Sequence, residues 1–289
     1  MRLIDALHNG SELLKDAGVE EFELDARLLL ENVLNKSRSQ LFLARDLKLT
    51  DSQVSQYQAF IERRQQREPV AYILGQQEFW SLSFSVSPHV LIPRPETEFL
   101  LDQVLSHANK TNFTRGKIVD LCCGSGVIAT VLAKETGQDV VAVDISSDAL
   151  LVSKQNIYRH NVQDQVQLVQ GDLLSSFQKI NQFSLVVSNP PYVNHIDVTN
   201  NLAPEVSDYE PHLALDGGVR GLELIKSIRE QLEDVLLPGG ELFMEIGADQ
   251  GQELLLMFTS TTNGLDGFLT VEILKDYAGR DRVVHAIKA

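Results

Sequence analysis

The sequence predicts an α/β protein: a doubly wound, seven-stranded Rossmann-like domain preceded by a small N-terminal helical bundle and a β-hairpin linker. From about residue 93 onward, short apolar runs alternate with helical stretches, as in a mostly parallel sheet with crossover helices. Residues 1–75 carry apolar side chains at helical spacing. Residues 76–92 include an alternating apolar and polar run typical of a half-buried strand. We therefore expect three parts, 1–75, 76–92 and 93–289.

The strands of the third part are expected where short apolar runs end in turn-forming residues. They begin near residues 117, 139, 166 and 183, and three more follow at 241–245, 269–274 and 282–287. The last two form a hairpin, so one strand of the sheet should be antiparallel. Residues 222–236 and 250–258 are predicted to be crossover helices.

A motif with chemical meaning follows the apolar run 183–188. It consists of Asn189, Pro190, Pro191 and Tyr192, and adjacent prolines must end a strand, because they donate nothing to its ladder. The Asn189 amide oxygen and the Pro190 carbonyl can each accept one hydrogen bond from an NH2 group, which leaves the nitrogen lone pair aimed at an electrophile. The Tyr192 ring is expected to wall a planar substrate. Standing alone, the tetrapeptide is more simply a loop.

A second predicted site begins where the apolar strand at residue 117 enters a loop of small residues: Cys122, Cys123, Gly124, Ser125 and Gly126. Gly124 and Gly126, with Ala129, fit the dinucleotide-binding fingerprint. Asp144 follows at the end of the next strand, where a carboxylate accepts both hydroxyls of a ribose. NAD and S-adenosylmethionine both carry that ribose, so the loop alone leaves a dehydrogenase and a methyltransferase open. The tetrapeptide at residue 189 favours the methyltransferase.

Three further residues are candidates for binding the same cofactor. Asp120 lies before the glycines and is predicted to receive the amino group of a methionyl moiety, directly or through water, a position that repels a pyrophosphate. Asp172 and Leu173 follow the strand near residue 166 and are predicted to meet the adenine edge. For Asp172, a helix N-cap before residues 173–177 is equally compatible with the sequence.

The segment between Tyr192 and Gly221 is rich in Pro, Asn, Asp and Gly, and we interpret it as a lid over the substrate. His195 and His212 lie in it. A solvated loop histidine is the favoured interpretation of each, with proton acceptor as the alternative.

Composition is compatible with a cytoplasmic enzyme, since 289 residues with 43% hydrophobic content can bury a sizeable core. No apolar run is long enough to span a bilayer. Cys122 and Cys123 are the only cysteines and are adjacent, which provides neither a disulfide framework nor a set of metal ligands. We interpret both as small buried residues, and we expect no metal and no membrane partner.

Charge is unevenly distributed along the chain. Residues 76–289 hold 15 Lys and Arg against 28 Asp and Glu, whereas residues 1–75 hold 10 against 12. Adenine N6 methyltransferases that act on DNA also carry Asn-Pro-Pro-Tyr, but they must neutralise phosphates with basic side chains. The acidic third part therefore argues against direct nucleic acid binding, and it suits a cofactor with a sulfonium cation.

The order of several motifs resembles one family closely. Residues 68–75 (EPVAYILG), Glu78-Phe-Trp80 and residues 90–98 (VLIPRPETE), followed by the glycine loop and Asn189 to Tyr192, resemble the bacterial release factor glutamine methyltransferases, the PrmC or HemK family. The resemblance implies S-adenosylmethionine as cofactor, S-adenosylhomocysteine as product, and the Gly-Gly-Gln glutamine of class I peptide chain release factors as target. It also implies substrate recognition by residues 1–75, although simple stabilisation of the enzyme explains the bundle as well.

The resemblance assigns roles residue by residue. Cofactor positions fall on residues 122–126, Asp144, Leu173 and Asn189. Substrate positions fall on Asn189, Pro190, Pro191 and Tyr192, and of these we assign catalysis to Asn189, Pro190 and Tyr192. Many relatives begin the loop with glycine where this chain has Cys122, so we expect a backbone conformation open to a residue with a Cβ atom there.

Several alternatives stay open beside this assignment. A ribosomal protein glutamine methyltransferase shares the glycine loop and the tetrapeptide but looks different around residues 93–98 and at 276–282. An adenine methyltransferase of DNA or RNA and a binding module without catalysis come next. Arg94, Glu96 and Glu98 are expected either to order the wall between the domains or to form a solvated helix entry with acids in its first turn.

Overall fold

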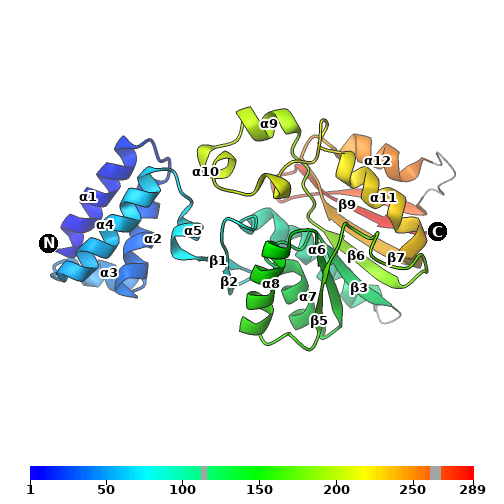
Figure 1. Ribbon diagram of the computed structural model, residues 1–289, viewed down its shortest axis with the longest axis horizontal. Coiled ribbons are helices and arrows are strands. Elements are labelled where there is room, and N and C mark those ends of the chain that lie inside the picture. Colours follow the sequence, from blue (N-terminus) through cyan, green and yellow to red (C-terminus); the bar gives the residue numbers. More distant parts are fainter. Residues whose placement is uncertain (112–115, 261–267) are drawn as a thin grey trace. The chain divides into compact units, whose positions relative to one another are not determined.

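The computed structural model describes residues 1–111, 116–260 and 268–289 (Figure 1). The chain forms two compact units. The first comprises residues 1–76 and 203–209, and the second residues 77–202 and 210–289. The short segment 203–209 therefore belongs to the first unit although the residues on both sides of it belong to the second, and no pattern in the sequence predicts this.

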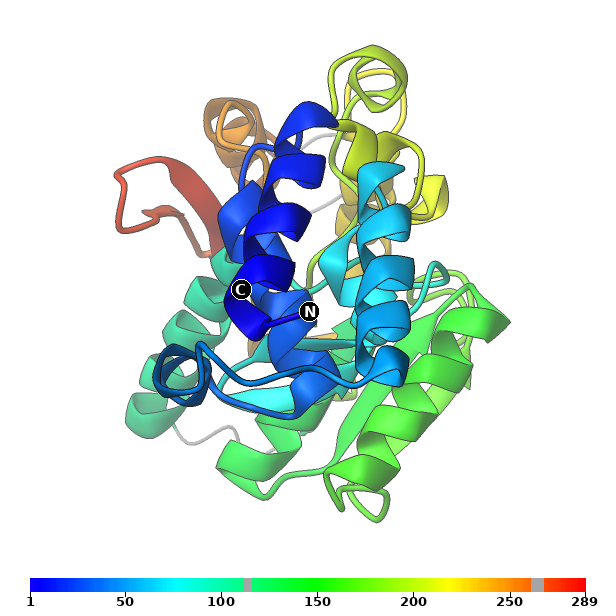
Figure 2. The ribbon, with the colours of Figure 1, turned by 90° about the vertical axis from the view of Figure 1, so that its left-hand side faces the viewer.

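The first unit is a helical bundle, as predicted. Its helices are α1 (Leu3–Asp16), α2 (Phe22–Leu34), α3 (Arg38–Leu43), α4 (Asp51–Gln65), α5 (Val70–Leu74) and the short α10 (Pro204–Ser207). Figure 2 shows α1 and α4, in dark and light blue, running side by side. Capping boxes start α3 at Ser37 and α4 at Thr50. Leucines from α1 and α2 form the fully buried centre: Leu14, Leu29 and Leu30.

Charged side chains hold α10 within this unit. The Arg64 guanidinium is buried and donates to Asp25 (2.7 Å) and to Glu205 (2.8 Å), and Arg67 donates to both oxygens of Glu205 at 2.8 Å. Partial burial raises the pKa of Glu205, but the bonds from Arg67 and Arg64 outweigh it and lower that pKa to about 2.

The second unit begins with the predicted hairpin and continues as a doubly wound sheet. The hairpin strands are β1 (Gln76–Phe79), whose first residue closes the first unit, and β2 (Leu82–Ser85). The described residues build a seven-stranded sheet in the order β5-β4-β3-β6-β7-β9-β8. Its strands are β3 (Lys117–Leu121), β4 (Val140–Asp144), β5 (Val166–Gln170), β6 (Phe183–Ser188), β7 (Leu236–Glu245), β8 (Thr270–Lys275) and β9 (Asp281–Ile287). Only β9 runs antiparallel to its neighbours β7 and β8, so the predicted fold class is confirmed.

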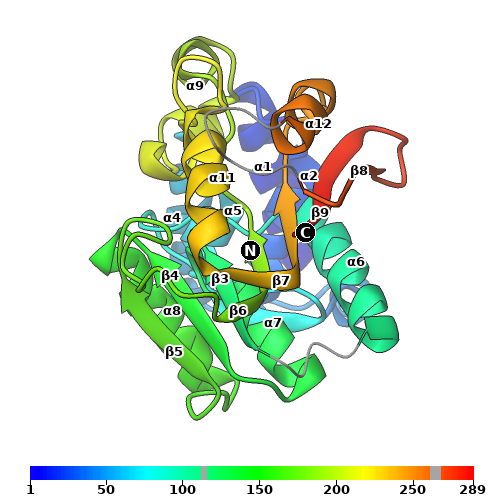
Figure 3. The same cartoon turned by 90° about the vertical axis from the view of Figure 1, so that its right-hand side faces the viewer.

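Helices cover both faces of this sheet. One core contains side chains of α6 (Pro95–Thr111), α7 (Val127–Thr136) and α8 (Ser147–Arg159), and the opposite core contains those of α11 (Glu223–Val235) and α12 (Gly251–Thr259). Figure 3 shows β7 between α11 on one side and α6 on the other. From β3 the chain adds β4 and β5 on one side of the sheet and then crosses to the other side of β3 to form β6. This change of direction beside β3 is a topological switch point, and open α/β sheets bind ligands at such points.

A buried polar cluster fixes the far end of α6 to the sheet. The Glu241 carboxylate accepts a hydrogen bond from His285 at 2.7 Å, and His107 of α6 lies 3.3 Å from the same oxygen. Among the described residues, His107, Glu241 and His285 form a group of three side chains whose ligand atoms lie close enough together to hold a metal ion. The expectation that the protein needs no metal stays a prediction.

The expected lid contains regular structure. Residues 193–220 form α9 (His195–Asn200), α10 and a 3-10 turn (His212–Ala214) instead of an irregular loop. None of the helices in the described ranges combines the length and the apolar character that crossing a bilayer requires.

Candidate active site

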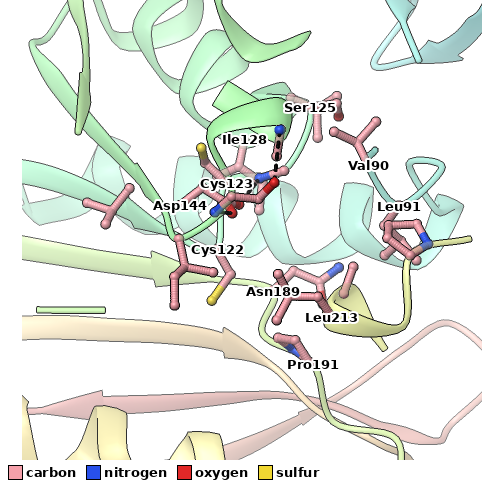
Figure 4. A pocket seen from close by; sticks show the side chains of 18 of the residues that line it. Val90, Leu91, Cys122, Cys123, Ser125, Ile128, Asp144, Asn189, Pro191 and Leu213 are labelled. Carbon is pink, nitrogen blue, oxygen red and sulfur yellow. Dashed lines mark hydrogen bonds between the residues drawn. The ribbon is translucent and has the colours of Figure 1, made fainter. Parts of the chain in front are cut away.

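A pocket opens at the carboxyl ends of β3, β4 and β6, beside the switch point (Figure 4). It lies entirely within the second unit. Nine of the predicted site residues line it: Cys122, Cys123, Gly124, Ser125, Asp144, Asp172, Leu173, Asn189 and Pro191. Four others do not: Asp120, Gly126, Pro190 and Tyr192. Its remaining wall is largely apolar and includes Val90, Leu91, Val143, Ile145 and Leu213.

Backbone conformation and one carboxylate shape the loop after β3. Gly124 and Gly126 have φ values of +52° and +77°, which favour glycine, and a Cβ atom at Gly126 would lie 2.8 Å from the Ser153 hydroxyl. The two Asp144 oxygens accept from the N–H groups of Gly124 (2.8 Å) and Ser146 (2.9 Å). The carboxylate at the end of β4 therefore holds the loop that ends β3, and Gly126 supports the loop without facing the pocket.

Two opposing effects act on the pKa of the Asp144 carboxyl. Burial raises the pKa of its carboxyl, and the backbone donors of Ser146 and Gly124 offset part of that effect. Each oxygen has used one lone pair on the backbone and retains capacity toward the pocket that the residue lines. This is the arrangement expected of a group that accepts two sugar hydroxyls.

The first loop residue contradicts the expectation stated for it. Cys122 has a φ of +57°, the left-handed region that L-residues with a Cβ atom avoid, so its backbone carries strain of about 1–2 kcal/mol. Burial raises the pKa of both the Cys122 and Cys123 thiols. Neither sulfur is therefore activated as a nucleophile. Cys123 is buried, as expected, whereas Cys122 is only partly buried.

Asp120 occupies a position beneath the loop. It is fully buried, and its Oδ2 accepts from the Ala129 N–H in the first turn of α7, at 3.0 Å. Its Oδ1 has no hydrogen-bond partner among the described residues, and burial raises the pKa of the carboxyl well above its usual range. The structure thus gives Asp120 a role in holding the loop, and its contact with a ligand stays a prediction.

The end of β5 supplies one polar and one apolar group to the pocket. Asp172 is exposed and Leu173 is buried with a φ of +53°. Residues 173–177 form turns and no α-helix, so the alternative interpretation of Asp172 as a helix N-cap is wrong.

On the opposite side of the pocket, Asn189 enters a chain of buried hydrogen bonds. Its Nδ2 donates to the Thr97 hydroxyl (3.0 Å), which donates to Glu245 Oε2 (2.7 Å). The other oxygen of Glu245 accepts from the Tyr192 hydroxyl (3.0 Å). Burial raises the pKa of Glu245, opposed by its bonds from Thr97 and Tyr192 and by the charge of Arg282.

Tyr192 differs in position from the predicted wall of the substrate site. Its ring packs against the core on the α11 side of the sheet and its hydroxyl points to Glu245. Thr97 and Glu245 were not predicted as site residues. The available signals were weak: a threonine in the first turn of α6, and an acidic residue at the carboxyl end of an otherwise apolar strand.

The residues around 94 make their polar contacts within the second unit. Arg94 lines the pocket and donates to the buried Glu210 at 2.5 Å, and Glu210 also accepts from the Ile92 N–H. Glu98 accepts from the Trp80 N–H at 2.6 Å. Of the two histidines considered as proton acceptors, His195 is exposed and paired with Asp216, and neither lines the pocket.

Comparisons with known proteins cover the whole chain. Residues 5–75 match the family model described as PrmC N-terminal domain, and residues 95–222 match the Methyltransferase small domain. The chain is 37% identical to the release factor glutamine methyltransferase of Clostridium acetobutylicum, over 100% of this chain and 99% of that protein. It is 39% identical to the protein of that name from Koribacter versatilis, over 98% of both.

Two solved structures share the fold. A methyltransferase from Pyrococcus furiosus is 19% identical, with a TM-score of 0.50, over 81% of this chain and 99% of that one. The 16S rRNA N2 G1207 methyltransferase of Thermus thermophilus is 17% identical, with a TM-score of 0.52, over 74% of this chain and 50% of that one. At these identities the likeness concerns the fold alone.

Proposed function

Because the chain belongs to the release factor glutamine methyltransferase family, we propose that it methylates the side-chain nitrogen N5 of the glutamine in the Gly-Gly-Gln motif of class I peptide chain release factors. The methyl donor is S-adenosylmethionine and the product is S-adenosylhomocysteine. The observation that carries the proposal is the position of Asn189, which lines the same pocket as Asp144 and the glycine loop. We place the reaction in the cytoplasm, with no direct nucleic acid partner.

The pocket residues fit the cofactor by the chemistry of their donor set. Asp144 offers acceptor capacity for ribose hydroxyls, and the apolar side chains of Val143, Ile145 and Leu173 line the same space, as a flat adenine requires. Gly124 leaves the loop open on its pocket side: apart from its chain neighbours, the Cys122 carbonyl is the only described group within 4 Å of a Cβ atom placed there. When bound, S-adenosylmethionine supplies an electrophilic methyl group on a sulfonium.

The protein's own contribution is to orient a poor nucleophile. The lone pair of an amide nitrogen is delocalised into its carbonyl, so the site must position the NH2 group and discourage planarity. The Asn189 oxygen and the Pro190 carbonyl would each accept one hydrogen bond from it, and both favour the positive charge that develops on the nitrogen. A proton then leaves to water, so no strong base is required of the pocket.

A groove on the first unit supports a protein substrate. Apolar side chains of α1 and α3 line it, and three arginines border it: Arg27, Arg38 and Arg45. Phe42 and Leu43 in this groove are 62% and 84% exposed, which is unusual for large apolar residues that lie beside each other. We propose that residues 1–75 dock the release factor while the second unit holds the glutamine.

Methylation assays with defined substrates test the proposal. Purified protein would be incubated with labelled S-adenosylmethionine and, separately, intact release factor, a short Gly-Gly-Gln peptide and the ribosomal protein that relatives methylate on glutamine. We expect mass spectrometry to find the methyl group on the release factor glutamine, with kcat/KM far above that of the peptide. Methylation of the ribosomal protein and not of the release factor would transfer the assignment to that alternative.

The docking role has its own matched pair of variants. Phe42→Ser with Leu43→Ser should raise KM for intact release factor roughly tenfold and leave the peptide unaffected, because only the protein reaches the groove. Leu256→Ser, at a 60% exposed position on α12, is the control. Equal losses with both substrates would leave the bundle with a stabilising role alone.

A further inference from the structure

We propose that Thr97 and Glu245 are positioning residues that hold the Asn189 side chain with its oxygen toward the pocket, and thereby make the site select an NH2-bearing side chain over a carboxylate. The inference rests on the proposed function, and it adds two residues to the site and a reason for glutamine specificity. The inference is based on four side chains from three different elements: Thr97 of α6, Asn189 and Tyr192 of the loop after β6, and Glu245 at the end of β7.

The chain of hydrogen bonds starts at Glu245, which is fully buried at the carboxyl end of β7. As a carboxylate it can only accept hydrogen bonds. Its Oε2 lies 2.7 Å from the Thr97 hydroxyl and its Oε1 lies 3.0 Å from the Tyr192 hydroxyl. Each hydroxyl therefore donates its single proton to one oxygen of Glu245.

The bond to Glu245 also decides how Thr97 contacts Asn189. Its proton is committed to Glu245, so toward any other partner its oxygen acts only as an acceptor. The partner is Asn189, whose side chain lies 3.0 Å away through Nδ2. An asparagine turned by 180° would place its carbonyl oxygen against the lone pairs of Thr97, and a buried, mismatched contact of that kind costs about 1–3 kcal/mol.

The Asn189 oxygen is consequently the atom left for the substrate. Thr97 and Asn189 both line the pocket, and Oδ1 accepts no hydrogen bond from the described residues. Figure 4 shows Asn189 at the pocket wall opposite Asp144 and Cys123. An acceptor held in this place matches the NH2 of glutamine and repels the carboxylate of glutamate.

The same logic explains why the asparagine is preorganised. An asparagine that turned freely would spend part of its time with its NH2 toward the pocket, where it binds a carbonyl or a carboxylate. Burial of the hydrogen-bond chain beneath it removes that state, since Thr97 is 3% exposed and Glu245 0%.

The test compares Thr97→Val with Thr97→Ser. Valine keeps the shape of threonine and removes the hydroxyl, so kcat on the release factor should fall roughly 10- to 50-fold, with the affinity for S-adenosylmethionine changed less than about twofold. Serine restores the hydroxyl and should recover activity to within about threefold of the wild type. Equal impairment of both variants would show that Thr97 acts through packing, and an unimpaired valine variant would overturn the inference directly.

Specificity provides a second measurement. A release factor with Gly-Gly-Glu in place of Gly-Gly-Gln should inhibit the wild type weakly and Thr97→Val at least about fivefold more strongly, because the turned Asn189 then donates to the carboxylate. Unchanged inhibition would contradict the selection of NH2 over carboxylate.

A spectroscopic readout keeps this inference separable from the proposed function. In protein labelled with 15N, the side-chain NH2 signal of Asn189, assigned by its loss in Asn189→Asp, should show one hydrogen-bonded, slowly exchanging proton in the wild type and in Thr97→Ser. Thr97→Val should lose that protection. If the wild type fails to methylate the release factor but Thr97→Val still loses the protection, the proposed function is wrong and the inferred orientation of Asn189 stands. If the spectrum of Thr97→Val is unchanged, the inferred orientation is wrong, whatever the substrate is.

Discussion

The two sides of the pocket are built in different ways. The cofactor side consists mainly of one stretch, the loop at residues 122–126, closed by Asp144 through backbone N–H groups. The substrate side consists of single side chains that lie far apart in sequence, Thr97, Asn189 and Glu245. A local backbone site binds a ligand in ground and transition states alike, whereas an oriented side chain acts on the reacting group. The two sides should therefore fail differently when they are mutated.

The largest effect is expected from Asn189→Ala. It removes the acceptor for the reacting NH2 group, so turnover should fall at least roughly 100-fold. Cofactor affinity, measured by calorimetry, should stay within about twofold, because the cofactor side is unchanged. Turnover within about tenfold of the wild type would remove Asn189 from its assigned role and erase the contrast between the two sides.

Asp144→Ala should produce the complementary result. It removes hydrogen bonds between a carboxylate and the ribose and also releases the Gly124 N–H, so the dissociation constant for S-adenosylmethionine should rise roughly 10- to 100-fold. Turnover at saturating cofactor should remain within about threefold. Asp144→Asn, which keeps one acceptor oxygen, serves as the intermediate control, and a large fall in saturated turnover with normal affinity would contradict the division.

The strained start of the loop gives a stability test on the cofactor side. Cys122→Val places a β-branched residue at a φ of +57° and should lower the free energy of unfolding by roughly 2 kcal/mol. Cys122→Gly is the matched control and should be at least as stable as the wild type in urea unfolding. Similar stability of the valine and glycine variants would argue against strain at Cys122.

Cys123→Ala should keep its methyltransferase activity, since the thiol of Cys123 has no step to perform.

A pH dependence should sharpen the assignment of Asp144. Burial raises the pKa of its carboxyl above 3.8, and only the ionised form offers every oxygen as an acceptor. Cofactor affinity is therefore complete above the raised pKa and falls as the pH drops through it. We expect calorimetry to show that the affinity for the cofactor weakens as the pH falls from neutrality through the raised pKa, with a flatter profile in Asp144→Asn. A profile that is identical in both proteins would place the titrating group elsewhere.

The sequence by itself determined the features that depend on neighbouring residues. Apolar periodicity predicts the helical bundle, the hairpin and the seven-stranded sheet, because burial of one face repeats at the pitch of the element. The loop from Cys122 to Gly126 and the position of Asp144 are also local, since small residues and a strand end suffice to place them. This agreement covers which elements form and where the loop lies, but not the backbone conformation of the loop, since Cys122 has a φ of +57°.

The tertiary structure alone decided which distant side chains meet. Thr97 and Asn189 are 92 positions apart, and Thr97 and Glu245 are 148 apart, so their contact depends on the strand order that brings β6 beside β7 and on α6 packing against that pair. The same holds for residues 203–209, which join the first unit through Glu205. The physical reason is that a hydrogen bond is set by distance in space, and its partners leave no periodic trace in the sequence when the fold, and not the local chain, brings them together.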